Sequence, residues 1–218
     1  MIEVDNLKLA YVKEYYSLYD ISFKIDEGEK VAFVGQNDSG KTSLLRVLAK
    51  LEKKTSGEIS FNEFPISDID FKYFNLGYIP SVPIFIDNKT ASWHFKYLLS
   101  LRGFNKNESE LKAKEVLNKF NLQDKKIKKM TLFEKRMLQF ALLSLRTIKV
   151  LLIDEILDFL TIDERKKIMD YIKELFKNEN LTAIIATKDV MVAKELGLKI
   201  YNLKLGSLVT GDVIYERQ

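Results

Sequence analysis

Eight consecutive residues have the types and spacing of a phosphate-binding loop. They are Gly35, Gln36, Asn37, Asp38, Ser39, Gly40, Lys41 and Thr42, and they fit the pattern G-x-x-x-x-G-K-[ST]. The two glycines permit a tight turn that aims backbone N–H groups at phosphate oxygens, and a helix beginning at Lys41 would add its positive end. The apolar segment Val31–Val34 supplies the preceding strand that this motif requires.

Individual side chains of the loop have separate predicted roles. Lys41 is expected to reach the β- and γ-phosphates of a nucleotide, and the Thr42 hydroxyl is expected to ligate Mg²⁺. Asp38 is unfavourable near a triphosphate unless its carboxylate points outward. The alternative interpretation of the motif is an ordinary glycine turn between a strand and a helix. The predicted nucleotide-binding set is Gly35, Gln36, Asn37, Asp38, Ser39, Gly40, Lys41, Thr42 and Ser43.

Two adjacent carboxylates supply the second half of the predicted site. Asp154 and Glu155 follow the apolar run Val150–Ile153, which predicts a buried strand. Open α/β sheets bind their ligands at the carboxyl ends of the strands. We therefore expect Asp154 to hold Mg²⁺ through water, and Glu155 to polarise an attacking water as general base. Taken alone, an acidic pair after a strand is also typical of a solvated loop.

The composition excludes several other kinds of site. The 218 residues include no cysteine and one histidine, His94, so disulfides, thiolate metal sites and histidine clusters are excluded. His94 itself is expected to be an ordinary helix residue. The net charge of +4 is small beside 35 basic and 31 acidic residues, which implies no strong field for polyanions. With neither a signal-peptide pattern nor an apolar run near the ~20 residues of a membrane span, the chain is expected to be soluble and cytoplasmic.

The elements that must position these residues are a set of strands and helices. Strands are expected at Ile2–Val4, Ile21–Ile25, Lys30–Val34, Glu58–Phe61, Leu76–Ile79, Lys149–Ile153 and Ala183–Ala186, with short strands around Gly206 and Gly211 in Ile200–Ile214. Helices are expected at Lys41–Leu51, Asp163–Phe176 and Asp189–Leu196. Leucines 44, 45, 48 and 51 have the spacing of one buried helix face.

The middle of the chain has a different composition. No glycine occurs between Gly103 and Gly197, and this stretch is rich in Leu, Lys and Glu, which indicates helices. We therefore expect one α/β folding unit over residues 1–218. Its core would be formed by 1–80 and 148–218, with an inserted helical subdomain at about 81–147.

Over nearly its whole length the chain resembles the ATP-binding subunit of an ABC transporter. The resemblance rests on the loop 35–42, on the run LLIDEI, and on AIIATKDVMVAKEL, which is similar to the switch region of that family. The stretch beginning LGYIPSVPIFIDNKTASWHF is most similar to the drug- and polysaccharide-exporter branch. The resemblance implies a P-loop NTPase of ABC type with a parallel-sheet core, an N-terminal antiparallel β subdomain and an inserted helical subdomain.

The resemblance also implies an ATPase with ATP and Mg²⁺ as ligands and a stacking role for one aromatic residue. Tyr11 matches the position that stacks on adenine, whereas Tyr15, Tyr16 and Tyr19 are expected in the core or on the surface.

Several positions depart from the pattern of the family. Ser81 stands where a glutamine is expected, and its shorter side chain cannot bridge Mg²⁺, water and a membrane subunit. Lys188 stands where a switch histidine is expected, and a point charge does not reproduce the geometry of a neutral imidazole. Thr161 occupies the position of the D-loop aspartate.

The signature motif, L-S-G-G-Q in the family, falls on residues 130–134 and is the most altered. Met130, Thr131, Leu132, Phe133 and Glu134 put bulk and a negative charge where the family has glycines that approach a phosphate. Thr131 and Glu134 instead have the spacing of a capping box, which satisfies the N–H groups of their own helix. The lysines just upstream (Lys125, Lys126, Lys128 and Lys129) either offset this charge or form a solvated face.

These features together predict an ATP-binding subunit of the export type that docks on a separate membrane permease at the inner face of the cell membrane. Subunits of the family pair head to tail, so the altered signature favours a heterodimer with a different ABC subunit, although a slow homodimer is the alternative. Two other classes stay open: a non-hydrolysing regulator with the ABC fold, and an ABC-type ATPase of DNA repair. The last is weaker because no sustained heptad insertion is present, and no nucleic-acid partner is expected.

Overall fold

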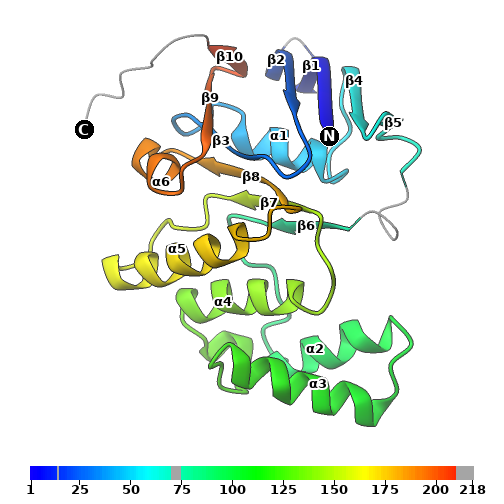
Figure 1. The fold of residues 1–218 in the computed structure, drawn as a ribbon, viewed down its shortest axis with the longest axis vertical. Coiled ribbons are helices and arrows are strands. Elements are labelled where there is room, and N and C mark those ends of the chain that lie inside the picture. Colours follow the sequence, from blue (N-terminus) through cyan, green and yellow to red (C-terminus); the bar gives the residue numbers. More distant parts are fainter. Residues whose placement is uncertain (14, 70–74, 210–218) are drawn as a thin grey trace. The chain divides into compact units, whose positions relative to one another are not determined.

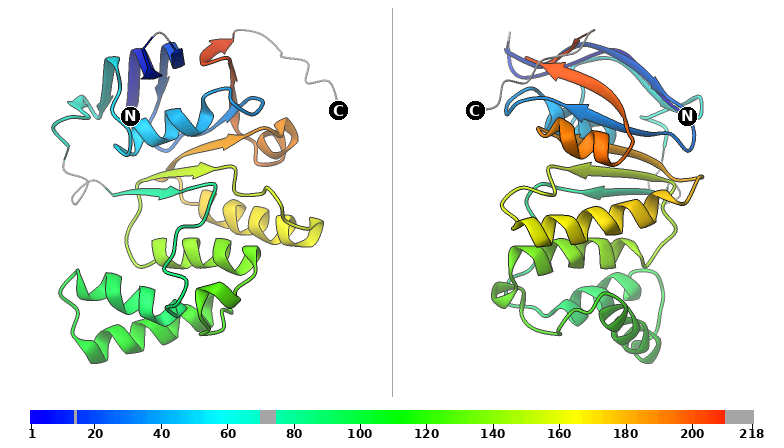
Figure 2. Two further views of the ribbon diagram at one scale, coloured as in Figure 1. Left: turned by 180° about the vertical axis from the view of Figure 1, so that it is seen from behind. Right: turned by 60° about the vertical axis from the view of Figure 1, so that its left-hand side comes forward.

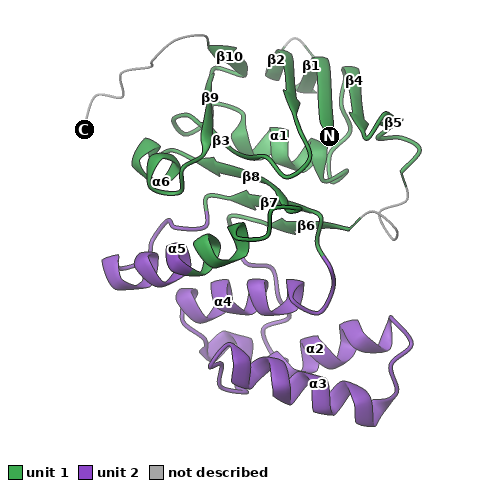
Figure 3. Ribbon diagram, in the orientation of Figure 1, with its two compact units in different colours: residues 1–81, 148–155, 171–218 green, residues 82–147, 156–170 purple. Residues whose placement is uncertain are grey.

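The computed structural model describes residues 1–13, 15–69 and 75–209 (Figure 1). The chain divides into two compact units, which Figure 3 distinguishes by colour. Unit 1 comprises Met1–Ser81, Ile148–Glu155 and Tyr171–Gln218, and unit 2 comprises Val82–Thr147 and Ile156–Asp170. The insertion predicted at 81–147 therefore lies almost entirely in unit 2, which also includes 156–170.

Unit 1 contains an antiparallel sheet in the order β2-β1-β4-β5. Its strands are β1 (Ile2–Val12), β2 (Tyr15–Ile25), β4 (Ser56–Phe61) and β5 (Phe64–Pro65). β1 pairs with β2 on one side and β4 on the other, and Ile2 and Val4 alternate inward with exposed neighbours. β1 and β2 run much further than the predicted strands at 2–4 and 21–25, because shifts in register let them stay paired beyond Leu7.

The second sheet of unit 1 has the order β10-β9-β3-β8-β7-β6. Its strands are β3 (Lys30–Val34), β6 (Leu76–Ile79), β7 (Val150–Asp154), β8 (Thr182–Thr187), β9 (Lys199–Lys204) and β10 (Ser207–Val209). All neighbouring strands are parallel except β10, which is antiparallel to β9. β7 and β8 are buried along their whole length, as predicted for central strands of a parallel sheet. The predicted turn at Gly211 lies outside the described residues.

Helix α1 (Lys41–Leu48) lies between the two sheets of unit 1 in Figures 1 and 2. Leu44, Leu45 and Leu48 belong to the same buried cluster as residues of both sheets. The predicted fourth member of this face, Leu51, is wrong: α1 ends at Leu48 and the Leu51 side chain is 56% exposed. Lys50 has a φ of 54°, a left-handed conformation that turns the chain out of the helix.

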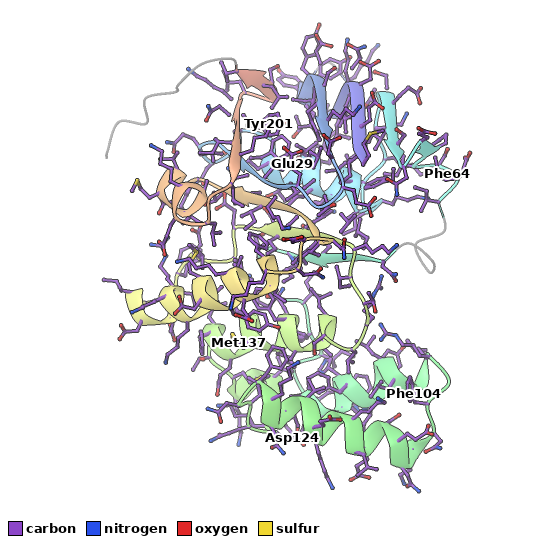
Figure 4. The ribbon with its side chains drawn as sticks, viewed as in Figure 1. Glu29, Phe64, Phe104, Asp124, Met137 and Tyr201 are labelled. Carbon is purple, nitrogen blue, oxygen red and sulfur yellow. The ribbon has the colours of Figure 1, made fainter. Side chains whose placement is uncertain are left out.

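Aromatic rings join the two sheets behind the phosphate loop. Tyr201 on β9, labelled in Figure 4, stacks on Phe33 of β3 with the ring centroids 5.2 Å apart, and Phe23 of β2 packs against both rings. The Tyr201 hydroxyl also donates to the backbone oxygen of Lys24, at 3.1 Å. These contacts hold β3, from which the loop departs, against the antiparallel sheet.

The remaining helices follow the predicted pattern. α6 (Val190–Glu195) belongs to unit 1, and α5 (Ile162–Phe176) begins in unit 2 and ends in unit 1. Unit 2 contains α2 (Ala91–Ser100), α3 (Lys106–Lys119), the short 3₁₀ helix η1 (Ile127–Lys129) and α4 (Leu132–Leu143), so its glycine-poor sequence is helical as predicted. None of the described helices is long and apolar enough to cross a membrane.

Candidate functional site

The loop between β3 and α1 depends on its two glycines. Gly40 has a φ of 100°, which L side chains rarely adopt, and a Cβ there would lie 2.6 Å from the backbone oxygen of Ser17. A Cβ on Gly35 would lie 2.3 Å from the backbone oxygen of Leu203. The loop is therefore enclosed by β2 on one side and the end of β9 on the other, and neither position has room for a side chain.

Lys41 lies at the centre of this loop, and its side chain is 4% exposed. Its ammonium donates to the backbone oxygens of Gly35 and Gln36, at 2.7 and 2.8 Å. The same ammonium forms an ion pair with Glu155 Oε1 at 3.1 Å. A buried ammonium must keep acceptors for its protons. The Lys41 ammonium is therefore already paired, and an entering phosphate would have to replace the Glu155 carboxylate.

The Thr42 hydroxyl donates to Asp154 Oδ1 at 3.1 Å. Asp154 is fully buried, and its Oδ2 atom has no hydrogen-bond partner in the described part of the chain. Burial raises the pKa of Asp154, while the hydroxyls of Thr42 and Ser81 and the charge of Lys41 oppose that rise. An unsatisfied carboxylate oxygen beside a hydroxyl fits a hard cation such as Mg²⁺. The described residues hold no cluster of three or more His, Cys, Asp or Glu, so water and phosphate oxygens would supply the remaining ligands.

Glu155 is held in a strained conformation at the end of β7. Its φ is 44°, which places a non-glycine residue in the left-handed region. Its N–H donates to the Ala186 oxygen at 3.0 Å, and its Oε2 accepts from the backbone N–H of Lys188 at 3.3 Å. The carboxylate is therefore fixed between Lys41 and the end of β8. Lys188 contributes through its backbone, and its side chain is exposed.

These groups line one pocket of about 540 Å³ in unit 1. Its lining consists of Tyr11, Ser17, Asn37, Asp38, Ser39, Gly40, Lys41, Thr42, Ser43 and Glu155. Seven of the nine residues predicted for nucleotide binding are among them, whereas Gly35 and Gln36 contribute their backbone oxygens to Lys41. Asp38 is exposed, with a φ of 60°, so its carboxylate is not buried among the phosphate-binding groups.

Two residues near this pocket were missed by the sequence analysis. Ser17 lines the pocket from β2, and nothing in its local sequence distinguishes it. Tyr78 lies in β6 beside β7, and burial together with the charge of Asp154 raises the pKa of the Tyr78 phenol above its usual range. Only the pairing of strands brings either residue to the site. Of the tyrosines expected in the core or on the surface, Tyr15, Tyr16 and Tyr19 on β2 are all exposed, the last two at 45% and 48%.

The sequence profile described as ABC transporter matches residues 18–158, well over half of the chain. This chain belongs to the ABC transporter family. The match includes the phosphate loop and the Asp154–Glu155 pair. The chain is therefore an ATP-binding domain of the ABC ATPase type.

Several curated relatives of this ABC domain have names of import proteins. The molybdate/tungstate import ATP-binding protein WtpC of Methanocaldococcus jannaschii is 28% identical over 97% of this chain and 71% of its own length. The maltose/maltodextrin import ATP-binding protein MalK of Mannheimia succiniciproducens is 30% identical over 87% of this chain and 52% of its own length. The chain thus spans only about half to three quarters of these two relatives. The exporter-like resemblance stays a prediction.

Solved structures confirm the predicted fold of this ABC domain. The ATP-binding cassette MJ0796, described as a dimeric post-hydrolysis state bound to ADP and Pi, superposes with a TM-score of 0.84 at 22% identity and covers 100% of both chains. The cbiO1 protein of Clostridium perfringens has a TM-score of 0.78 at 23% identity and covers 95% of this chain and 86% of that one.

Residues 131–134, where the sequence analysis expects the signature motif, form the predicted capping box in unit 2. The Thr131 hydroxyl accepts from the N–H of Glu134 at 3.2 Å, and the Glu134 carboxylate accepts from the N–H of Thr131 at 2.7 Å. Lys125 pairs with Glu134 at 2.7 Å, so one lysine offsets this charge, whereas Lys126, Lys128 and Lys129 are exposed. The capping box thereby satisfies N–H groups at the start of α4 that an uncapped helix would offer to an anion.

Two further positions of unit 2 also have structural partners. Thr161 makes a second capping box with Glu164 at the start of α5, through hydrogen bonds of 3.0 and 3.3 Å. His94 lies in α2, where its Nδ1 donates to the Thr90 oxygen at 2.8 Å and its Nε2 accepts from the Ile86 N–H at 3.1 Å. Both ring nitrogens are thus used within the helix and its preceding loop.

The capping carboxylate of Glu134 makes the stability of unit 2 depend on pH. Burial acts to raise the pKa of Glu134, but the Lys125 ammonium and the hydrogen bonds of Thr131 outweigh it and hold the pKa below its usual range. The stabilisation is therefore complete above the unfolded pKa of about 4.3 and is lost as pH falls through the lower folded value. The difference in free energy of unfolding between wild type and Glu134→Gln should be constant above about pH 5 and shrink below pH 4.

Urea titrations at several pH values measure this difference. Glu115, exposed on α3 of the same unit, supplies the matched control, because Glu115→Gln removes an acid outside any cap. A Glu134→Gln difference that is the same at pH 3.5 and pH 7 would contradict the proposed role of the ionised carboxylate.

Proposed function

We propose that this chain is the ATP-binding and hydrolysing subunit of an ABC transporter, and that it couples Mg²⁺-ATP turnover to a separate membrane permease at the inner face of the membrane. The single observation that carries this proposal is the meeting of Lys41, Thr42, Asp154 and Glu155 in and beneath one pocket. In this proposal Lys41 binds the phosphates, Thr42 and Asp154 would hold the metal, and Glu155 activates the attacking water.

The reaction would begin with the exchange of partners at Lys41. The γ-phosphate of ATP replaces the Glu155 carboxylate at the ammonium. Glu155 then accepts a proton from the attacking water, whose oxygen bonds to the γ-phosphorus while the bond to the β–γ bridging oxygen breaks and ADP leaves. Thr42 and Asp154 would hold Mg²⁺, which supplies charge neutralisation at the β- and γ-phosphates. The backbone N–H of Lys188 keeps Glu155 in place throughout, because it binds the other carboxylate oxygen. Tyr11 offers an exposed ring at the rim of the pocket for the base.

Hydrolysis by the isolated chain is proposed to be slow. Lys188 presents no imidazole, and the Ser81 side chain is too short for the bridging role of a glutamine. The capped start of α4 presents the carboxylate of Glu134 in place of glycines, which would repel a phosphate bound by another subunit. We therefore propose a heterodimer with a second ABC subunit that retains a glycine-bearing signature, and a slow homodimer is the alternative.

The direction of transport is a separate matter. Export was predicted from the sequence and stays a prediction, while the relatives named above are import proteins. Coupling to a permease does not depend on the direction.

A second candidate function has support from unit 2. The capping boxes at Thr131 and Thr161 occupy N–H groups at the starts of α4 and α5, where the signature and D-loop motifs are expected. This is compatible with a regulator that binds ATP without hydrolysing it. The turnover of the Glu155 variant described below separates the two candidates.

Replacement of Lys41 should weaken ATP binding. Lys41→Ala removes a charge-assisted phosphate contact of roughly 1.5–3 kcal/mol, so the dissociation constant should rise about tenfold to a hundredfold in calorimetric titration. Lys53, exposed in the turn after α1, is the matched control, since Lys53→Ala removes the same charge outside the pocket. Equal ATP affinity of wild type and Lys41→Ala would discard the site assignment.

Glu155→Gln should separate binding from turnover. The amide keeps the shape but accepts no proton, so turnover should fall about 100-fold or more. ATP affinity should be kept or increased, because the carboxylate that competes for Lys41 is gone. Phosphate release and calorimetry with the assembled transporter measure both quantities, with Glu3→Gln as an exposed acid control. If Glu155→Gln turns over at the wild-type rate, another base must act; if the wild type shows no turnover, the regulator is favoured.

ATP should contribute little to self-association of this chain. A ligand drives association only by contacts that it gains in the associated state, and the capped signature offers few. Light scattering of Glu155→Gln alone with saturating Mg²⁺-ATP should therefore give the mass of a monomer. A stable ATP-dependent homodimer would refute the heterodimer proposal and show that residues 131–134 still hold nucleotide.

A further inference from the structure

Three hydroxyl groups form a hydrogen-bonded chain along one wall of the pocket. The Tyr11 hydroxyl lies 3.2 Å from Ser43 Oγ, and Ser43 Oγ lies 2.7 Å from Ser17 Oγ. All three residues line the pocket, and they come from β1, α1 and β2. Ser43 belongs to the first turn of α1, so the chain ties the β1–β2 hairpin to the helix that follows the phosphate loop.

Two irregularities in the hairpin place these side chains. The register between β1 and β2 passes from Leu9–Leu18 to Ala10–Tyr16, which leaves one extra residue, Ser17, on β2. It then passes to Val12–Tyr15, which leaves one extra residue, Tyr11, on β1. A bulge redirects the side chain of its extra residue and is common beside functional sites. Both of these extra residues line the pocket, whereas two further register shifts lie nearer the start of β1, between Val4 and Leu9.

The backbone of the Ser17 bulge also packs against the loop. A Cβ on Gly40 would lie 2.6 Å from the Ser17 oxygen, and a Cβ on Gly206 would lie 2.7 Å from the same atom. The backbone of Ser17 is thus closely packed against Gly40 and Gly206. Its hydroxyl reaches Ser43 at the shorter of the two distances in the chain.

The chain of hydroxyls has one proton to spare. Each hydroxyl carries one proton, and two hydrogen bonds use two of the three. The remaining proton belongs to Tyr11 or Ser17 when the bonds run in one direction, or to Ser43 when Ser43 accepts from both neighbours. In each arrangement the network keeps one donor on a residue of the pocket wall, available to a ligand oxygen.

We propose that Ser17 is a positioning residue which, through Ser43, fixes the hydroxyl and ring of Tyr11 at the rim of the pocket, so that the site selects its ligand by the nucleoside as well as by the phosphates. This inference rests on the nucleotide site proposed above. Tyr11 is 55% exposed, and an exposed ring needs such a tether to keep one orientation. A ring already held in place binds a base without first losing its freedom, whereas tripolyphosphate does not contact it.

The test compares ATP and inorganic tripolyphosphate, each with Mg²⁺, by calorimetry on the full chain. Ser17→Ala should weaken ATP binding about three- to tenfold, the range for one lost hydrogen bond, and leave tripolyphosphate binding unchanged. Tyr11→Phe should do the same, and the double variant should lose no more than either single one, because both changes break one network. Ser17→Thr keeps the hydroxyl and should restore ATP affinity.

Two controls distinguish positioning from a general change in the fold. Tyr15→Phe removes a hydroxyl from a side chain of the same hairpin that is 78% exposed, and it should leave ATP affinity unchanged. Each single variant should melt within about 4 °C of wild type, since it loses one exposed or part-buried hydrogen bond. Equal ATP affinity of Ser17→Ala and wild type, additive losses in the double variant, or equal losses for ATP and tripolyphosphate would each overturn the inference. A wild-type chain that binds neither ligand would refute the nucleotide site itself.

Discussion

The buried ammonium of Lys41 is the constraint around which the rest of the site is arranged. A positive charge out of contact with water is tolerated only when acceptors surround it, and here they are the oxygens of Gly35 and Gln36 and the carboxylate of Glu155. The two backbone acceptors require the tight loop, and the loop requires glycines where strands β2 and β9 approach it. The third acceptor, the carboxylate of Glu155, requires β7 to end beside β8, the strand next to β3.

The order of the parallel sheet meets that requirement. β8 lies between β3 and β7, and the carboxyl ends of all three strands meet at one edge. Gly35 donates to the Thr187 oxygen, and Glu155 donates to the Ala186 oxygen, so the last residues of β8 bind both halves of the site. A phosphate loop and an acidic pair more than a hundred residues apart in sequence are thereby held in contact by the one strand between them.

The sequence was sufficient to predict which charged side chains meet, because their signals are local. The glycine spacing before Lys41 and the apolar run before Asp154 each define an element, and the strand-end rule joins them. Ser17 and Tyr78 have no such signal: the first depends on a bulge in β2, and the second on the pairing of β6 with β7. The predicted fourth leucine of α1 failed for a related reason, because helical spacing continues through Leu51 although Lys50 has already left the helix. Patterns of spacing therefore predict helices and strands well, but they predict poorly the contacts that depend on the register between strands.

The left-handed backbone of Glu155 lowers the stability of the chain at a position that the proposed reaction requires. An L residue in this conformation costs about 1–2 kcal/mol relative to glycine, which adopts it freely. A glycine at this position would relieve that cost and would also remove the carboxylate that we propose as the general base. Random substitution followed by selection for thermal stability alone would thus tend to discard the carboxylate. The position has the character of a functional residue that a folded protein retains at the expense of its own stability.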